Sequence, residues 1–65
     1  METILVFSNA TNDQMSAYTE ATRAECEDVA KKIWDHINYH FAFIEPDGSH
    51  TPTKLPAYRN VGSMA

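Results

Sequence analysis

Residues 22–33 read TRAECEDVAKKI and open with a capping box, which is the pattern of a helix start. The Thr22 hydroxyl and the Glu25 carboxylate each bind a backbone N–H that the first turn of a helix leaves without a partner. We therefore predict a helix that begins at Arg23. Asn38 is suited to end it, because asparagine tolerates the left-handed conformation common there. Apolar residues recur between these ends at three- and four-residue steps, on one stripe that faces a core: Cys26, Val29, Ala30, Ile33 and Ile37.

Two strand-like segments precede this helix. Residues 3–7, TILVF, are a continuous β-branched and aromatic run bounded by turn-forming residues, and they predict a strand. Residues 14–21 alternate less regularly and predict a second, weaker strand. A competing interpretation makes residues 15–37 one long helix. The capping box argues against it, because a continuous helix offers no free N–H groups at that position.

Aromatic and turn-forming residues follow the helix. Residues 39–44, YHFAFI, predict a third strand. The tripeptide Pro46-Asp47-Gly48 has the chemistry of a tight turn, since proline favours its first corner and glycine tolerates positive φ. Residues 49–54 would return from that turn as a short fourth strand, which Pro52 confines to the edge of the sheet.

Together these elements predict a small two-layer α+β domain in the order strand, strand, helix, strand, with or without the fourth strand. One helix packs on a short antiparallel sheet. Residues 1–54 form this single domain, and residues 55–65 form a C-terminal tail without periodicity. The alternative fold is the long helix of residues 15–37 with a hairpin.

Size and composition favour binding over catalysis. Apolar residues make up 43% of the 65 residues and charged residues 22%, as in globular proteins. A chain this short rarely supplies the walls of a cleft, a positioned acid or base and their supporting residues. Its two glycines, Gly48 and Gly62, do not form a phosphate-binding loop. We predict a protein that is not an enzyme, with no catalytic residues and no cofactor.

The sequence also indicates a location and a class of partner. Cys26 is the only cysteine, which fits a reducing compartment, and neither a signal peptide nor a membrane-spanning stretch is recognisable. We therefore expect a cytoplasmic protein with no membrane partner. The net charge of −4 disfavours direct binding to nucleic acid.

His36 and His40 are four residues apart and Asp35 adjoins them, which is a spacing that could hold a metal ion on a helix. The helix is expected to end between the two histidines, so we predict no metal site. The simpler role for His36 is to oppose the helix dipole as a cation near the C-terminal end.

The predicted strands of residues 3–7 and 39–44 are apolar on both sides, whereas one helix covers only one face of a sheet. We expect the second face to bind a partner, with Ile4, Val6, Ala42 and Ile44 as its contact residues. The alternative is that the tail folds back and covers this face with Leu55, Tyr58 and Val61.

Other residues suit an interface. Trp34 lies at the margin of the helix stripe, where its ring is either half-buried at the core edge or presented to a partner. Glu27 and Asp28 belong to an acidic surface that could compete for a nucleic-acid-binding site on a partner. Tyr58 and Arg59 give the tail a basic, aromatic character that could stack on a base.

Residues 18–30, YTEATRAECEDVA, run from strand into capped helix, and this passage resembles small accessory proteins encoded by bacteriophages. That group includes inhibitors of host RNA polymerase and of CRISPR complexes. The resemblance implies a small inhibitor that docks on a larger protein or complex in the cytoplasm of a bacterial host. The alternatives are a nucleic-acid accessory protein that acts through the tail, and a self-associating structural subunit such as a homodimer.

Overall fold

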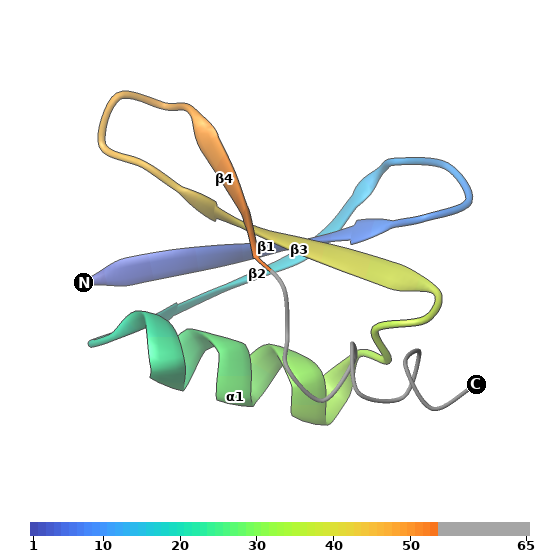
Figure 1. Cartoon of the computed structure of the whole chain (residues 1–65), viewed down its shortest axis with the longest axis horizontal. Coiled ribbons are helices and arrows are strands. Elements are labelled where there is room, and N and C mark those ends of the chain that lie inside the picture. Colours follow the sequence, from blue (N-terminus) through green and yellow to red (C-terminus); the bar gives the residue numbers. More distant parts are fainter. Residues whose placement is uncertain (54–65) are drawn as a thin grey trace.

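A computed structural model describes residues 1–53, which form one helix and one four-stranded sheet in two layers (Figure 1). The small α+β fold predicted from the sequence is confirmed, and the long-helix alternative is wrong, because residues 14–20 form a strand. The elements are β1 (Glu2–Ser8), β2 (Gln14–Glu20), α1 (Arg23–Ile33), β3 (Tyr39–Ile44) and β4 (His50–Thr53).

The sheet joins two hairpins through its central strands. The strand order is β2-β1-β3-β4, and every neighbouring pair is antiparallel. The β1–β2 and β3–β4 pairs are local hairpins, whereas β1 and β3 pair across the intervening helix. Figure 1 shows the tips of both hairpins rising away from the side on which α1 lies.

The core lies between α1 and the central strands. Ile4 and Val6 of β1 stand opposite Phe43 and Phe41 of β3, and all four side chains are at most 4% exposed. Cys26 and Ala30 of α1 close this cluster from the helix side. Full burial of a side chain such as Ile4 contributes roughly 1.5–3 kcal/mol, so this cluster is the main source of stability in so short a chain.

The capping box is present as predicted and α1 begins at Arg23. The backbone N–H of Glu25 donates to Thr22 Oγ1 over 3.2 Å, and the backbone N–H of Thr22 donates to Glu25 Oε1 over 3.1 Å. Thr22 itself is extended, with φ −129° and ψ 162°, so the chain turns sharply from β2 into the helix at this residue.

The helix ends one turn earlier than its apolar stripe predicts, at Ile33. Asp35 causes this end, because its Oδ1 accepts the backbone N–H groups of Ile37 over 3.0 Å and of Asn38 over 2.7 Å. A carboxylate that binds the N–H groups two and three residues ahead competes with the helix for those donors. Ile33 and Ile37 are therefore 59% and 65% exposed, and their assignment to the core stripe is wrong.

The remaining turns follow the expected chemistry. Gly48 adopts φ 91° between β3 and β4, and Asn12 adopts φ 66° between β1 and β2, where asparagine tolerates a left-handed backbone. Pro52 lies in β4, an edge strand, as predicted. The tail and the fold-back of Leu55, Tyr58 and Val61 lie outside the described residues.

We expect Thr22→Ala to lower the free energy of unfolding by about 1 kcal/mol, because it leaves a helix N–H without its acceptor. Urea denaturation followed by circular dichroism measures this loss. Thr22→Ser is the matched control, since it keeps the accepting hydroxyl. An equal loss in both variants would contradict a capping role for that hydroxyl.

Candidate functional site

The sheet face opposite α1 is the candidate binding site, and we call it the open face. Successive residues of a strand point to opposite faces, so the neighbours of the core residues Ile4 and Val6 point away from the helix. Within residues 1–53, no helix or strand covers this face (Figure 1). Strand pairing places ten residues on it: Thr3, Leu5, Phe7, Ala17, Thr19, His40, Ala42, Ile44, His50 and Pro52.

Two of the four contact residues predicted for the second sheet face are misplaced. Ile4 and Val6 are completely buried beneath α1, because they share a face with Phe41 and Phe43. Ala42 and Ile44 do lie on the open face.

Exposure on the open face is uneven. Leu5 and Ala42, at its centre, are only 6% exposed each, whereas Ile44 is 39% exposed at its margin. Phe7 is partly exposed. The apolar surface offered to a partner is therefore small and concentrated at particular side chains.

Three aromatic rings gather on the open face. The Phe7 ring of β1 stacks on the His40 ring of β3, with ring centroids 5.2 Å apart and an interplanar angle of 17°. The His50 ring of β4 lies with its centroid 5.9 Å from that of Phe7. These rings border a depression of about 290 Å³, which is also lined by Asn12, Phe41, Ala42 and Pro52. A volume of that size admits one or two side chains of a partner.

Asn9 determines the orientation and tautomer of His40. The Asn9 amide nitrogen Nδ2 donates to the carbonyl of Ile37 over 2.9 Å, so its Oδ1 is the acceptor and lies 2.6 Å from Nδ1 of His40. His40 must then donate from Nδ1. When the ring is neutral, its Nε2 is the nitrogen that can accept a hydrogen bond from a ligand.

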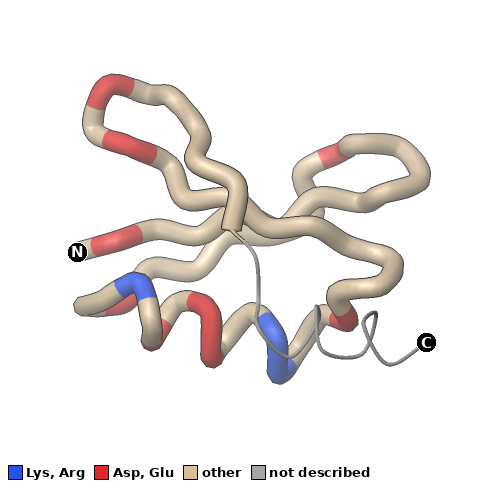
Figure 2. The backbone as a smooth tube through the Cα atoms, viewed as in Figure 1, with Lys and Arg blue, Asp and Glu red and all other residues tan. Residues whose placement is uncertain are grey.

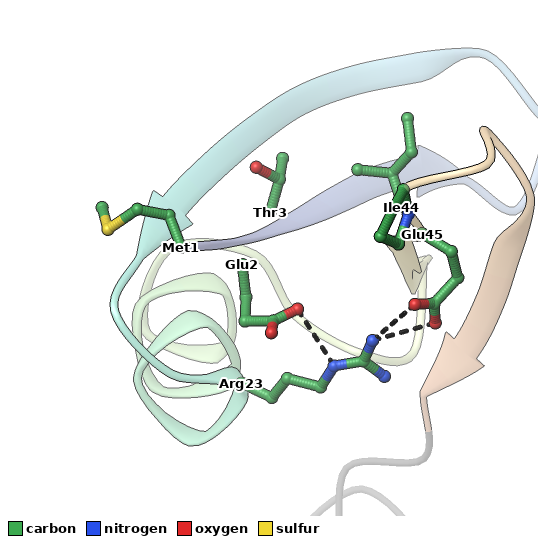
Figure 3. A pocket seen from close by; sticks show the side chains of 7 residues that line it. Met1, Glu2, Thr3, Arg23, Ile44 and Glu45 are labelled. Carbon is green, nitrogen blue, oxygen red and sulfur yellow. Dashed lines mark hydrogen bonds and ion pairs between the residues drawn. The ribbon is translucent and has the colours of Figure 1, made fainter.

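A second hollow, of about 430 Å³, lies at the other end of the molecule around Arg23 (Figure 3). Arg23 Nε donates to Glu2 Oε1 over 3.2 Å, and its Nη2 donates to both oxygens of Glu45 over 2.7 and 2.9 Å. The guanidinium also lies 4.6 Å above the Phe43 ring centroid. Because two carboxylates already occupy Arg23, this hollow is unsuited to an anionic ligand, and we interpret the cluster as a clamp between β1, α1 and β3.

The pKa values of Glu45 and Arg23 are shifted in the clamp. The pKa of Glu45 lies below its ordinary value of 4.5, chiefly because the Thr51 hydroxyl donates to the carboxylate and secondly because Arg23 does. The pKa of Arg23 is raised in turn, chiefly by its hydrogen bond to Glu45. Glu45 thus stays ionised at a more acidic pH than a free glutamate.

Three other predicted contact residues lie away from the open face: Trp34, Glu27 and Asp28. Trp34 packs against the core: its Nε1 donates to the Tyr18 hydroxyl over 2.8 Å, and its ring meets Tyr39 edge-on at 4.8 Å. This favours the core-edge interpretation. Glu27 accepts a hydrogen bond from Thr53, and Asp28 pairs with two lysines of α1. Tyr58 and Arg59 lie outside the described residues.

The residues considered for metal binding and catalysis are dispersed. His40 is on β3. The Asp35 carboxylate accepts hydrogen bonds from backbone N–H groups, and these bonds lower the pKa of Asp35, the bond from Asn38 most of all. His36 lies three residues beyond Ile33, the last residue of α1. Cys26 is buried. Among residues 1–53 we find neither a group of three or more ligating side chains nor a helix long and apolar enough to cross a membrane.

Comparisons with protein-family models, curated proteins and solved structures found no match to this chain. Its function is therefore inferred from the geometry of its own residues.

Sequence reasoning missed two features of the site, the Arg23 clamp and the ring cluster of Phe7, His40 and His50. Each is assembled from segments far apart in the sequence, so only the β1–β3 and β3–β4 registers bring its members together. The one available signal was local. Phe7 and His40 both lie in strand-like runs. In such a run every second residue must face away from the helix.

We expect Thr51→Val to raise the pKa of Glu45 towards 4.5, since it removes the hydroxyl that contributes most to the shift. A carboxylate with a lowered pKa stabilises the fold fully above pH 4.5, and that contribution is lost as the pH falls through the folded-state value. The variant should therefore lose less stability than the original protein between pH 6 and pH 3. Carboxyl ¹³C NMR titration and urea denaturation measure the two effects.

Thr53→Val is the matched control for Thr51→Val. It makes the same change in the same strand, but the hydroxyl that it removes donates to Glu27 and not to Glu45. It should leave the titration of Glu45 unchanged. An unaltered Glu45 titration in Thr51→Val would contradict the role given to the Thr51 hydroxyl.

Proposed function

We propose that this protein is a non-enzymatic binding module that docks through its open face on a larger protein or complex. One observation carries the proposal. The sheet has apolar residues on both faces, and α1 covers only one of them within residues 1–53. An uncovered apolar sheet face is unusual in a monomer and marks an interaction surface.

The shape of the open face supports docking rather than general hydrophobic exposure. Ile44 and Phe7 provide partly exposed apolar contacts on either side of the nearly buried Leu5 and Ala42. The depression beside Phe7 offers a site for an anchoring side chain of the partner. A few anchors in well-packed pockets provide most of the free energy of binding at protein interfaces.

The resemblance of residues 18–30 to small phage accessory proteins gives the proposal a biological setting. We propose a phage-encoded inhibitor that occupies a surface of a bacterial host protein or complex in the cytoplasm. The small size of the domain supports this setting, because so small a domain acts more readily by covering a surface than by catalysis. Inhibition follows if the covered surface is one that the host complex needs.

The open-face proposal is tested by Ile44→Ser, which removes an exposed apolar contact without changing charge. We expect affinity for a partner captured from bacterial lysate to fall roughly fivefold, since partial burial of an isoleucine contributes about 1 kcal/mol. Purified partner and surface plasmon resonance give the affinity. Circular dichroism confirms that the variant folds.

Ile33→Ser is the matched control, because Ile33 is 59% exposed at the end of α1, away from the open face. It should bind as the original protein does. Equal weakening by both variants, or none by Ile44→Ser, would remove the open face from the interaction. Capture of nucleic acid instead would favour the alternative that acts through the tail.

A second candidate function, self-association, is favoured by the contrast between the two sheet edges. The edge strand β4 has four residues including Pro52, which blocks strand addition. β2 has seven residues with neither proline nor lysine, and a bulge opposite Val6 and Phe7 disturbs only its first residues. An edge of this kind is a template for a strand from a second copy.

We expect light scattering to detect a dimer that depends on concentration if this second function is correct, and Ala17→Lys to abolish it. A lysine in the middle of an edge strand opposes the approach of another strand. Ala17→Thr, which favours β structure, is the control and should leave the dimer intact. A monomer at every concentration would exclude self-association through β2.

A further inference from the structure

We infer that the segment docking on the open face is positively charged and inserts an arginine or lysine side chain among Phe7, His40 and His50. This inference rests on the proposed function and specifies the chemistry of the partner. It follows from how the charges and the hydrogen-bond acceptors are distributed over the two sides of the molecule.

The charges of the described residues are segregated. All three lysines and arginines of residues 1–53 belong to α1, on the side opposite the open face: Arg23, Lys31 and Lys32. Both hairpin tips, which rise on the open side, carry only acidic residues among their charged side chains, as Figure 2 shows. Asp13 lies in the β1–β2 tip and Asp47 in the β3–β4 tip.

The Asp47 carboxylate stays ionised at a more acidic pH than a free aspartate, because its pKa is lowered. Ser49 donates its hydroxyl over 2.7 Å and its backbone N–H over 2.9 Å to Asp47 Oδ1, and these bonds lower the pKa of Asp47. Asp13 is exposed to solvent. An approaching cationic segment therefore meets a negative potential on each side of the open face, and a potential of this sign accelerates its encounter.

The depression itself matches a cationic side chain. The face of the Phe7 ring offers the electron-rich surface on which guanidinium and ammonium groups stack. Neutral His40 offers Nε2 as an acceptor, because Asn9 binds its Nδ1. A lysine or arginine stem can in addition contact the apolar side chains of Ala42 and Pro52 on the floor of the depression.

Charge also disfavours the other occupants of this face. Nucleic acid would bring phosphates against Asp13 and Asp47. A second copy docked face to face would oppose its own acidic hairpin tips to those of the first. A neutral apolar segment would supply no cation for the tip carboxylates and no donor for Nε2 of His40, although it could still cover Ile44.

A binding assay with defined peptides tests the inference on the full chain. The probe is a fluorescein-labelled ten-residue peptide of alternating arginine and leucine, and the comparison peptide has glutamate in place of arginine. We expect fluorescence anisotropy to show binding of the arginine peptide only, weakening as salt is raised. Backbone NMR shifts should change at Phe7, His40 and His50.

Two substitutions locate the charge effect. Asp13→Asn and Asp47→Asn should each weaken binding of the arginine peptide about two- to fivefold, the size expected when an exposed ion pair is lost. Asp28→Asn is the matched control, because it removes the same charge from α1, where Asp28 pairs with lysines. It should change the affinity by less than either tip variant.

The outcomes separate this inference from the function on which it rests. Equal weakening by all three variants, NMR shifts centred on α1, or equal binding of the glutamate peptide would overturn the cationic-segment inference. Any of these results leaves the open face as a docking surface if Ile44→Ser still reduces capture of the partner. If Ile44→Ser has no effect on capture, the proposed function fails whichever peptide binds.

Discussion

The pairing of β1 with β3 is the interaction on which the rest of the structure depends. Each hairpin alone would be a two-stranded ribbon, which is marginally stable in water. Pairing Ile4 with Phe43 and Val6 with Phe41 joins the two ribbons into one sheet and forms the apolar surface on which α1 packs. The Arg23 clamp reinforces the same junction, because its two carboxylates come from β1 and from the end of β3.

That pairing also creates the open face. In a strand every second residue points the other way, so a register that buries Ile4 and Val6 directs Leu5 and Phe7 to the opposite side. One helix of eleven residues cannot cover both sides. The uncovered apolar face is thus a geometric consequence of folding this sequence on a single helix, and a binding role makes use of a surface that the fold must expose.

The sequence predicted the elements governed by local chemistry. The capping box located the helix start, and residues 39–44 were correctly identified as a strand. Each of these signals is contained within a few consecutive residues. The helix end was predicted wrongly. The apolar stripe extends to Ile37, but the Asp35 carboxylate accepts hydrogen bonds from backbone N–H groups that a longer helix would use. The contact residues Ile4 and Val6 were placed on the wrong face, because the facing of a strand is set by its register with distant partners. The Arg23 clamp and the ring cluster escaped notice for the same reason.

The two histidines of the open face limit how much apolar surface it exposes to water. If His40 and His50 were large apolar residues, the face would carry a continuous hydrophobic patch that favours aggregation. With histidine at both positions, Phe7 is flanked by polar rings. The central Leu5 and Ala42 are only 6% exposed each. The same two rings leave polar atoms around the depression, so an occupant must satisfy acceptors as well as cover apolar surface. If the open face binds a partner as proposed, that partner is selected by its chemistry and not by hydrophobicity alone. Because all lysines and arginines of residues 1–53 lie on α1, this selection favours a cationic segment.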